Sequence, residues 1–558
     1  MIPEHMKRII YILSILILAV SCIEDLSQYE YKDTNKVTFL SVMEGYTFTM
    51  GETAEIVAPI EFSKPFENEA DIDKAFQIGW YLNEELIAEG YRITYQFPRV
   101  GGFALIIKVV DRVDGNTYLS ERYSVESKSS IGWGWMILSD HGNNESSLSF
   151  ISPVSMVTSH KLEELFGFEE PLGTGPKSLD YYYVRGSING SYISGLPKVI
   201  LNQSSGTVTL DGRNLQPDKL MRDEFEGGAE PEQDFTINGF AYKSNYYLIA
   251  TGEGNLYVRT MHRDYEEIPY YGTYSSMPYA FDGDAYISYF QGFQNVTYWT
   301  ANESTALVYD SLNSRFMTFV PGDYFGYDYE TYCPKVVYLS YYDETVEFDP
   351  SVPKVNNLGM GTRCLAAGAY EMVGSDESGY GVAFTPKYVA LLDLGGSGNY
   401  QVYQFAVSPM GYEDHKIIEN TMHPFAGASL LNEKSVIRMS TNFEKNPYFY
   451  FTDGDKNLYV YSMATQTYAR LYTASSRITH LCNSPIVCEF KEYGGNNEQP
   501  NFRMAVGQED GKIAIVDVDK SKMVKVFEGA SPNLEIRVLS GFGDIKDIVW
   551  ATNYEGEY

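Results

Sequence analysis

Tyrosine and aspartate gather in two stretches of this chain, and both residue types suit ligand binding. The stretches are residues 265–289, which include IPYYGTYSSMPYAFDGDAYISY, and residues 323–332, DYFGYDYETY. Tyrosine rings stack on sugar faces or pack against peptide side chains, and carboxylates accept hydrogen bonds from hydroxyls or amides. The alternative is that these tyrosines simply line strands, which aromatic side chains favour. The candidate ligand-binding residues are Tyr265, Tyr270, Tyr271, Tyr274, Tyr279, Asp282, Asp284, Tyr324, Tyr327 and Tyr329.

Motifs for catalysis are missing from the sequence. It contains no HExxH zinc motif, no phosphate-binding P-loop and no GxSxG nucleophile turn, and the run 395–398, GGSG, departs from the GxSxG spacing. Carboxylates are abundant, so an acid–base pair of the glycosidase kind stays open. The sequence therefore favours a binding protein, with no catalytic residue and no cofactor, over an enzyme that cleaves glycans.

The sequence gives little support for a metal site or a disulfide bond. The tripeptides Asp282-Gly283-Asp284 and Asp453-Gly454-Asp455 offer oxygen ligands for calcium, but neither continues into a full binding loop, and Asp-Gly is a common turn signal. We therefore interpret both as turns and expect no metal. Cys482 and Cys488 would pair if they lay on adjacent strands, whereas buried free thiols are the favoured alternative.

A repeated pattern of short strands indicates what holds these residues in place. Residues 446–472 read as three alternating runs joined by tight turns, which favours an antiparallel meander. The pattern returns at residues 246–259, 305–319 and 504–527, with the starts of second strands, Leu256 and Leu307, 51 residues apart. A meander that recurs about every fifty residues is typical of a β-propeller blade.

The remaining apolar runs complete the expected ring. Seven blades are favoured and eight are the alternative. The last run, 547–552, has no partner strands of its own, so we expect it to close the ring by joining the first blade. The expected blades hold residues 135–151, 198–210, 240–261, 285–320, 365–405, 425–472 and 479–527.

A smaller domain precedes the expected propeller. Residues 37–128 contain short strands separated by Gly, Pro and Asn turns, which indicates a β-sandwich with Trp80 in its core. The sequence thus predicts an all-β protein with an N-terminal immunoglobulin-like sandwich followed by a β-propeller. The expected divisions are a signal peptide with its cysteine at 1–22, a tether at 23–36, the sandwich at 37–128 and the propeller at 129–558.

Composition excludes two classes of partner. The 558 residues carry a formal net charge of −32, which argues against binding to nucleic acid or to anionic membrane surfaces. Aromatic residues make up 15% of the chain, with 48 tyrosines, and the hydrophobic fraction of 44% is that of an ordered protein. We therefore expect contact with a membrane only through an anchor.

The N-terminus has the pattern of a secretory signal. Lys7 and Arg8 precede the apolar run 9–20, which is too short to span a bilayer comfortably. The tetrad at 19–22, AVSC, resembles a bacterial lipobox, in which the cysteine, here Cys22, becomes the lipidated first residue of the mature chain. The acidic pair at 24–25 resembles the export signal of surface-displayed lipoproteins of Bacteroidota.

Several later segments point to one family. The segment 101–111, GGFALIIKVVD, resembles the late strands of a PKD-type immunoglobulin-like domain. Together with GWGWMILSD at 132–140 and PLGTGP at 171–176, it resembles the PKD-like lipoprotein family of Bacteroidota. The resemblance implies a lipoprotein anchored in the outer membrane and facing outward. Its implied partners are a SusC/SusD-type nutrient importer and an oligosaccharide or oligopeptide ligand. The alternatives are a propeller glycan hydrolase or lyase, and a structural subunit that binds only the importer.

Overall fold

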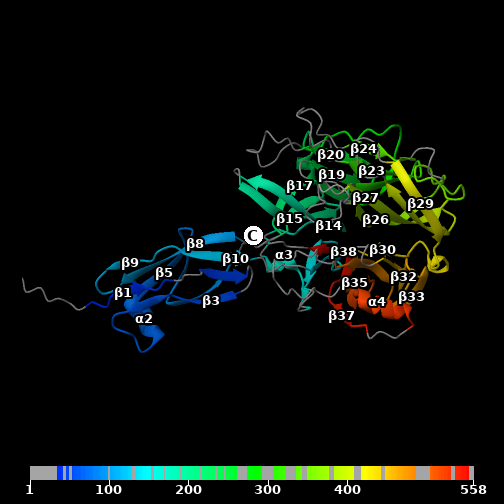
Figure 1. The fold of residues 1–558 in the computed structure, drawn as a ribbon. Helices are drawn as coiled ribbons and strands as arrows, with labels where there is room; N and C mark the ends of the chain where they lie inside the picture. Colours follow the sequence, from blue (N-terminus) through cyan, green and yellow to red (C-terminus); the bar gives the residue numbers. More distant parts are fainter. Residues whose placement is uncertain are drawn as a thin grey trace, which may run out of the picture. The chain divides into compact units, whose positions relative to one another are not determined.

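The computed structural model describes the chain from residue 34 to residue 551, apart from internal segments. The chain divides into two compact units, one of residues up to Phe97 together with Gly101–Lys128, and one from Ser129 onward (Figure 1). The segments left out are 42–44, 50–52, 98–100, 129–133, 153–155, 157, 167, 169, 189–190, 213–214, 233–234, 244–245, 261–272, 292–305, 321–334, 342–347, 376–382, 408–415, 441–446, 485–502 and 530–533.

Short strands and one helix make up the first unit. Its elements are β1 (Val37–Phe39), β2 (Tyr46–Thr49), β3 (Thr53–Val57), β4 (Ile60–Phe62), α2 (Glu69–Ala75), β5 (Phe76–Leu82), β6 (Glu85–Glu89), β7 (Arg92–Gln96), β8 (Gly101–Asp111), β9 (Thr117–Leu119) and β10 (Tyr123–Lys128). Strands β2, β10, β8, β5 and β6 lie in that order in one sheet, with β9 paired to β8. Strands β1 and β4 form a second sheet, and β3 and β7 form a third.

One hydrophobic core is shared by the three sheets of the first unit. Side chains of β8 alternate between buried and partly exposed, as the period of two in a strand requires. Trp80 of β5 is fully buried and its Nε1 donates a hydrogen bond to the carbonyl oxygen of Gly90 at 2.8 Å, which confirms the expected core aromatic. Ile56 of β3 and Ile60 of β4 pack into the same core. The relation to PKD-type domains stays a prediction.

Antiparallel sheets of three to five strands make up the second unit. Blade one contains β13 (Thr158–Ser159), β12 (Ser147–Ile151), β11 (Gly134–Asp140) and β38 (Asp544–Ala551) in that order. Blade two contains β14 (Pro176–Ile188), β15 (Ser191–Gln203), β16 (Val208–Asp211) and β17 (Pro217–Leu220). Blade three contains β18 (Ile237–Lys243), β19 (Tyr246–Thr251) and β20 (Leu256–Thr260).

The later blades continue the pattern. Blade four contains β21 (Ile287–Gln291), β22 (Ala306–Asp310), β23 (Arg315–Val320) and β24 (Lys335–Tyr338). Blade five contains β26 (Arg363–Ser375), β27 (Ala383–Leu394), β28 (Asn399–Val407), β29 (Lys416–Pro424) and β25 (Ser340–Tyr341). Blade six contains β30 (Ile437–Met439), β31 (Tyr448–Thr452), β32 (Asn457–Ser462) and β33 (Thr467–Thr473). Blade seven contains β34 (Ile478–Asn483), β35 (Arg503–Gln508), β36 (Lys512–Asp517) and β37 (Ile536–Ser540).

The innermost strands of these sheets form a closed ring. Strands β38, β14, β18, β21, β26, β30 and β34 contact one another in that cyclic order, and β34 contacts β38 again. The described part of the second unit is therefore a β-propeller with seven blades, and the predicted all-β propeller is confirmed.

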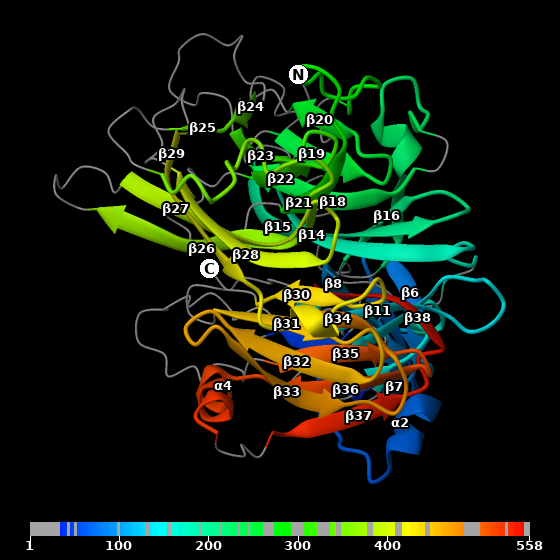
Figure 2. The same ribbon diagram turned by 90° about the vertical axis from the view of Figure 1, so that its right-hand side faces the viewer.

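The closing strand comes from the far end of the described chain. Strand β38 pairs antiparallel with β11, so that Trp135 lies opposite Trp550, and Figure 2 shows the two strands side by side. The expected closure of the ring by this run is confirmed. Because β38 completes the sheet of blade one, the inner edge of β11 is paired rather than exposed.

Adjacent blades bury both faces of each other's strands. All five residues of β31, YFYFT, are buried, as are those of β12. Strands covered on both faces read as continuous apolar runs, which is why the sequence shows few polar positions there. One apolar cluster joins Tyr450 of blade six to Val506 and Val516 of blade seven, and similar clusters lie between other blades.

Two expectations about blades six and seven were wrong. The run 520–527 was expected to be a strand, but it forms helix α4 (Lys520–Phe527), begun by Asp519, whose side chain accepts a hydrogen bond from the backbone N–H of Ser521. Its apolar residues Met523, Val526 and Phe527 recur at helical spacing and pack on the core between the two blades. Blade six begins at β30, not at residue 425.

The other helical elements are short. They are α3 (Leu162–Leu165) and the 3-10 turns η1 (Met221–Glu224) and η3 (Ala428–Leu430). Across the described residues, no helix has the length and apolar character to cross a bilayer.

Candidate functional site

The predicted binding residues are only partly covered by the structure. Tyr274, Tyr279, Asp282 and Asp284 belong to the segment that leads into β21. The remaining six predicted positions, Tyr265, Tyr270, Tyr271, Tyr324, Tyr327 and Tyr329, lie outside the described residues.

Tyr274 lies in the protein core. Only 3% of the residue is exposed, and its ring packs 5.3 Å from that of Phe225 in the apolar cluster beside blade three. The backbone N–H of Tyr274 donates a hydrogen bond to the carbonyl oxygen of Glu224 at 2.8 Å. The expectation that this ring contacts a ligand is therefore corrected, because a fully packed ring has no face left to offer.

Tyr279 is half-buried and anchors the segment that leads into β21. Its hydroxyl accepts a hydrogen bond from the backbone N–H of Val336 at 3.2 Å. Its ring lies 5.3 Å from the rings of both Phe281 and Phe319. This residue ties the segment to strands β23 and β24 of blade four.

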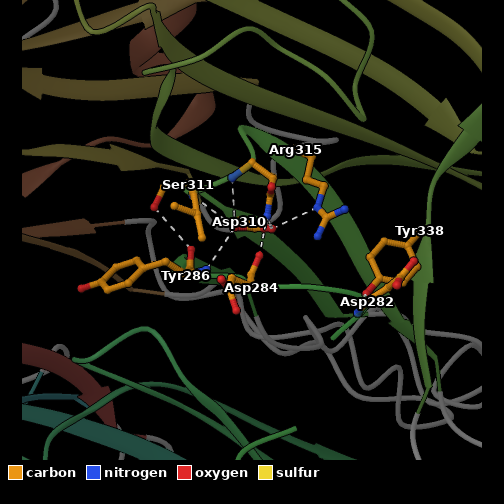
Figure 3. A network of polar contacts seen from close by, with 9 residues as sticks. Asp282, Asp284, Tyr286, Asp310, Ser311, Arg315 and Tyr338 are labelled. Carbon is orange, nitrogen blue, oxygen red and sulfur yellow. Dashed lines mark hydrogen bonds and ion pairs between the residues drawn. The ribbon is translucent and has the colours of Figure 1, made fainter. Parts of the chain in front are cut away.

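Asp282 and Asp284 are exposed and lie beside exposed side chains of blade four (Figure 3). The backbone N–H of Asp282 donates a hydrogen bond to the hydroxyl of Tyr338 at 2.6 Å, and the carbonyl oxygen of Asp284 accepts one from Asn313 Nδ2 at 2.8 Å. Both carboxylates are left facing solvent. We call the exposed set Asp282, Asp284, Tyr286 and Tyr338 the blade-four rim.

One buried carboxylate organises the rim. Asp310, at the end of β22, is fully buried. Its Oδ1 accepts hydrogen bonds from the backbone N–H groups of Tyr286 at 3.1 Å, Leu312 at 3.1 Å and Asn313 at 3.3 Å. Its Oδ2 accepts one from the Nε of Arg315 at 3.0 Å and one from Asn313 Nδ2 at 2.6 Å. The carboxylate therefore joins the segment before β21 to the turn between β22 and β23.

The guanidinium held by Asp310 also supports an aromatic ring of the rim. The Cζ of Arg315 lies 4.9 Å from the centre of the Tyr338 ring, within the range of a cation–π contact. Tyr338 is thereby positioned by Arg315 on its face and by Asp282 at its hydroxyl. The exposed fractions are 43% for Tyr286 and 37% for Tyr338. The rim thus presents two aromatic rings beside two carboxylates that are exposed to solvent.

The tripeptides interpreted as turns have turn structure. The Oδ1 of Asp453 accepts hydrogen bonds from the backbone N–H groups of Asp455 at 3.0 Å and Asn457 at 3.1 Å. Gly454 and Gly283 have φ values of 74° and 88°, in the left-handed region that favours glycine. Among the described residues, no group of three or more His, Cys, Asp or Glu side chains has the arrangement of a metal site.

A second cluster of charged residues lies where the innermost strands meet. The cluster consists of Asp180 of β14, Arg438 of β30, His480 of β34 and Asp547 of β38. The charges of Arg438 and Asp547 act on the pKa values of both Asp180 and His480. We call these four residues the axis cluster. Burial, with a further contribution from the charge of Asp547, raises the pKa of Asp180 to about 7, while Arg438 opposes the shift.

The other members of the axis cluster have defined partners. Burial raises the pKa of Asp547, although its Oδ2 accepts a hydrogen bond from the backbone N–H of Leu179 at 2.9 Å and its Oδ1 one from Ile548 at 2.8 Å. Burial lowers the pKa of His480, so its neutral form is favoured. Arg438 is exposed, and its Nε donates a hydrogen bond to the carbonyl oxygen of Leu481 at 3.1 Å.

Nearby thiols are protonated. Burial raises the pKa of Cys482 to about 12, and burial also raises the pKa of Cys364. Both are free cysteines. The predicted free state of Cys482 is therefore confirmed, and Cys488 lies outside the described residues.

The axis cluster was missed by the sequence analysis because its members are scattered over the chain. Each stands on a different innermost strand, and nothing in their spacing links residue 180 to residue 547. A signal was present, because Asp547 begins the run 547–552, which was expected to close the ring, and so puts a carboxylate on an innermost strand. A charged residue in such a strand needs a partner of opposite charge or a hydrogen-bond donor, and only the closed ring shows which residue that partner is.

No protein-family model matches this chain, and no curated protein does. Similar solved structures include a quinonprotein alcohol dehydrogenase-like protein from Bacteroides thetaiotaomicron, at 13% identity and a TM-score of 0.37, over 92% of this chain and 96% of the other.

Two further solved structures show fainter similarity. Prp20p from Saccharomyces cerevisiae matches at 9% identity and a TM-score of 0.29, over 76% of this chain and 88% of the other. PorZ, a surface component of the type-IX secretion system of Porphyromonas gingivalis, matches at 8% identity and a TM-score of 0.20, over 75% of this chain and 50% of the other. The propeller assignment rests on the order of the strands, independently of these similarities.

Proposed function

We propose that this chain is a lipid-anchored binding protein of the outer-membrane surface. It captures or presents an oligomeric substrate, a glycan or a peptide, to an importer of the SusC/SusD type, and it performs no catalysis. The lipobox ending at Cys22 and the resemblance of residues 101–111 and 132–140 to PKD-like lipoproteins support the anchor and the partner.

The blade-four rim is the observation that carries the binding role. Its side chains are exposed, yet both rings are held in place. The hydroxyl of Tyr286 donates a hydrogen bond to the carbonyl oxygen of Gly252 at 3.1 Å, and Arg315 lies against one face of the Tyr338 ring, so the rings lose little side-chain entropy when a ligand binds. The exposed parts of the two rings offer apolar surface, and Asp282 and Asp284 accept hydrogen bonds. Such a surface suits contact with sugar rings or with peptide side chains.

The test compares retention with cleavage. The purified protein is incubated with mixtures of oligosaccharides and of oligopeptides, and the bound and free fractions are analysed for retention and for shortened products. Retention without shortened products supports the binding role. Steady release of shorter oligomers would replace it with the propeller hydrolase or lyase.

A rim variant and a matched control variant test whether the ligand binds at the blade-four rim. The double variant Tyr286→Ala/Tyr338→Ala should weaken retention about tenfold or more, because each ring contributes on the order of 1–3 kcal/mol to a contact. Tyr468, on the outermost strand of blade six, has a similar exposed fraction of 38%, and Tyr468→Ala should leave retention unchanged.

Co-purification tests the partner. Mild detergent extraction of the outer membrane should bring the importer subunits down with the tagged protein. If neither ligand mixture is retained and the importer still co-purifies, the protein is the purely structural subunit instead.

A further inference from the structure

We infer that the ligand of the blade-four rim is a peptide that carries both basic and apolar side chains, and that Leu312 and Met360 belong to the surface that holds it. This inference rests on the binding role proposed above. It narrows the ligand from a glycan or a peptide to a cationic peptide.

Three exposed apolar residues stand on neighbouring segments beside the rim. Tyr286 is 43% exposed, Leu312 in the turn between β22 and β23 is 58% exposed, and Met360 in the segment that leads into β26 is 93% exposed. We call these three residues the apolar ridge. A single apolar residue on a surface is ordinary, whereas a contiguous group marks a surface for contact with a partner.

Backbone hydrogen bonds show that the three segments are contiguous. The backbone N–H of Ser311 donates a hydrogen bond to the carbonyl oxygen of Tyr286 at 2.9 Å (Figure 3). On the other side of the same turn, the backbone N–H of Leu358 donates one to the carbonyl oxygen of Ser314 at 2.9 Å. The turn 311–314 is therefore hydrogen-bonded to both neighbouring segments, and the apolar ridge crosses three joined segments.

The turn around Met360 leaves almost the whole residue in solvent. Gly359 and Gly361 on either side of it have φ values of 91° and 81°, in the left-handed region that favours glycine. Leu358, just before them, is buried and fixes the start of the turn. A methionine side chain is flexible and polarisable, so it adapts to irregular apolar side chains, but it has no flat face to stack on a sugar. An exposed methionine therefore favours a peptide over a glycan.

Three carboxylates border the apolar ridge without a cation of their own. Asp282 and Asp284 precede Tyr286 in the same segment, and Glu253 lies in the turn whose Gly252 carbonyl oxygen accepts the hydroxyl of Tyr286. All three carboxylates are exposed, and in the part of the chain that the structure describes none of them forms an ion pair. Their charge is thus available to a ligand.

The charge pattern selects the ligand class. Hydrogen bonds to the hydroxyls of a neutral glycan would leave three like charges uncompensated, and an anionic ligand would be repelled. Lysine or arginine side chains would pair with these carboxylates, which favours one class of partner over others. The formal net charge of −32 also attracts cations at long range. Apolar surface bordered by unpaired carboxylates is therefore complementary to a peptide with basic and apolar side chains.

Fluorescence anisotropy with labelled probes tests the inference on the purified full-length lipoprotein in a non-ionic detergent, with a detergent-only titration subtracted. Three peptides of equal length are compared. The first contains lysine, leucine and glycine, the second has glutamate in place of lysine, and the third has serine in place of leucine. Maltoheptaose is the glycan probe. We expect the lysine–leucine peptide to bind about tenfold or more tightly than each of the other three probes.

Salt dependence and charge variants test the carboxylates. Binding of the lysine–leucine peptide should weaken several-fold between about 0.1 M and about 1 M salt, because the screening length falls from about 10 Å to about 3 Å. The variant Glu253→Gln/Asp282→Asn/Asp284→Asn should bind this peptide more weakly at low salt and lose most of the salt dependence. The matched control changes three exposed carboxylates near blades six and seven and should behave as wild type does, Asp455→Asn/Glu528→Gln/Glu535→Gln.

A second pair of variants tests the apolar ridge. Leu312→Ser/Met360→Ser removes exposed apolar surface, so it should weaken binding of the lysine–leucine peptide about tenfold and leave the melting temperature unchanged. Leu165→Ser/Val538→Ser, which changes exposed apolar residues of α3 and β37, is the matched control and should bind as wild type does.

Failure of the inference and failure of the proposed function give different results. Binding of maltoheptaose or of the glutamate peptide as tightly as the lysine–leucine peptide would overturn the inference and leave the binding role in place. Wild-type binding by both the ridge variant and the carboxylate variant would do the same. Absence of binding of every probe and of both ligand mixtures, or release of shortened products, would remove the binding role and the inference together.

Discussion

The Oδ2 of Asp547 accepts a hydrogen bond from the backbone N–H of Leu179 at 2.9 Å, joining two residues 368 positions apart in the chain. Asp547 stands on β38, the strand that completes blade one, and Leu179 on β14, the first strand of blade two. The contact therefore ties the C-terminal strand of blade one to the first strand of blade two.

Removal of the closing strand should destabilise the propeller. A chain that ends at Gly543 lacks β38, which leaves the inner edge of β11 unpaired and uncovers the apolar cluster of Trp135 and Ile137. We expect aggregation or a fall in melting temperature of more than 10 °C, a rough value for the loss of several kcal/mol in a large domain. A chain that ends at Ala551 keeps β38 and is the control. Equal melting of all three chains would contradict closure by this strand.

Neutralisation of Asp180 should change how stability depends on pH. Its pKa is about 7 in the folded protein, raised by burial and by Asp547 and opposed by Arg438, against about 4 in an unfolded chain. The folded state therefore binds the proton more tightly, so the stability of wild type falls as pH rises from about 4 to about 7.

The variant Asp180→Asn lacks this dependence. Its free energy of unfolding relative to wild type should rise across that pH window, by an amount on the order of 2–4 kcal/mol, and stay constant above it, as measured by denaturant titration at each pH. The exposed Asp455→Asn is the control. A constant difference between Asp180→Asn and wild type at every pH would show that Asp180 does not titrate in this range.

Asp310 should matter far more than the exposed carboxylates it supports. Asp310→Ala removes five hydrogen-bond contacts and leaves the partly buried guanidinium of Arg315 without its ion-pair partner, at a cost of about 3–5 kcal/mol. Asp284→Ala, at an exposed position, should change the free energy of unfolding by less than about 0.5 kcal/mol. Denaturant titration measures both. Similar small effects would mean that Asp310 does not organise the rim.

Alanine variants of Tyr274 and Tyr286 should differ in effect, because the first ring packs in the core and the second is exposed on the surface. Tyr274→Ala empties a packed position next to Phe225 and should lower the free energy of unfolding by about 3–5 kcal/mol. Tyr286→Ala should affect stability little and ligand retention more. If Tyr274→Ala instead kept the wild-type free energy of unfolding but retained less ligand, Tyr274 would be a ligand contact after all.

Anchoring should depend on Cys22. Because an acyl chain contributes roughly 0.8 kcal/mol per buried CH₂, Cys22→Ala should be lost from the outer-membrane fraction. Incorporation of radioactive palmitate into the protein measures the modification directly. A Cys22→Ala protein that still incorporates label would remove the basis for the lipoprotein assignment.

Local patterns in the sequence were sufficient for the fold. The period of two in the strands and the Asp-Gly turns identified blade six, and the isolated run at 547–552 identified the closing strand. The run 520–527 was misassigned because its apolar residues fit both the period of a strand and the period of a helix. Only the packing of Met523 and Phe527 against blades six and seven shows that the run is a helix.

The candidate site was predictable only in part. Asp282 and Asp284 are exposed as a polar loop suggests, but Tyr274 is buried, because composition alone does not distinguish a tyrosine in a core from one on a surface. The organising carboxylate, Asp310, looks like an ordinary turn residue in the sequence. The axis cluster could not be found at all before the ring was known, since its four members share no local pattern.

The pairing of β38 with β11 also sets the order of events during folding. Three strands of blade one come from the start of the propeller sequence. Its fourth strand, β38, can pair with β11 only after the residues around Trp550 have been synthesised. Blades two to seven draw their strands from continuous stretches, so each sheet forms from local contacts. The axis cluster therefore assembles last, and a chain that lacks β38 would leave Trp135 and its apolar neighbours uncovered.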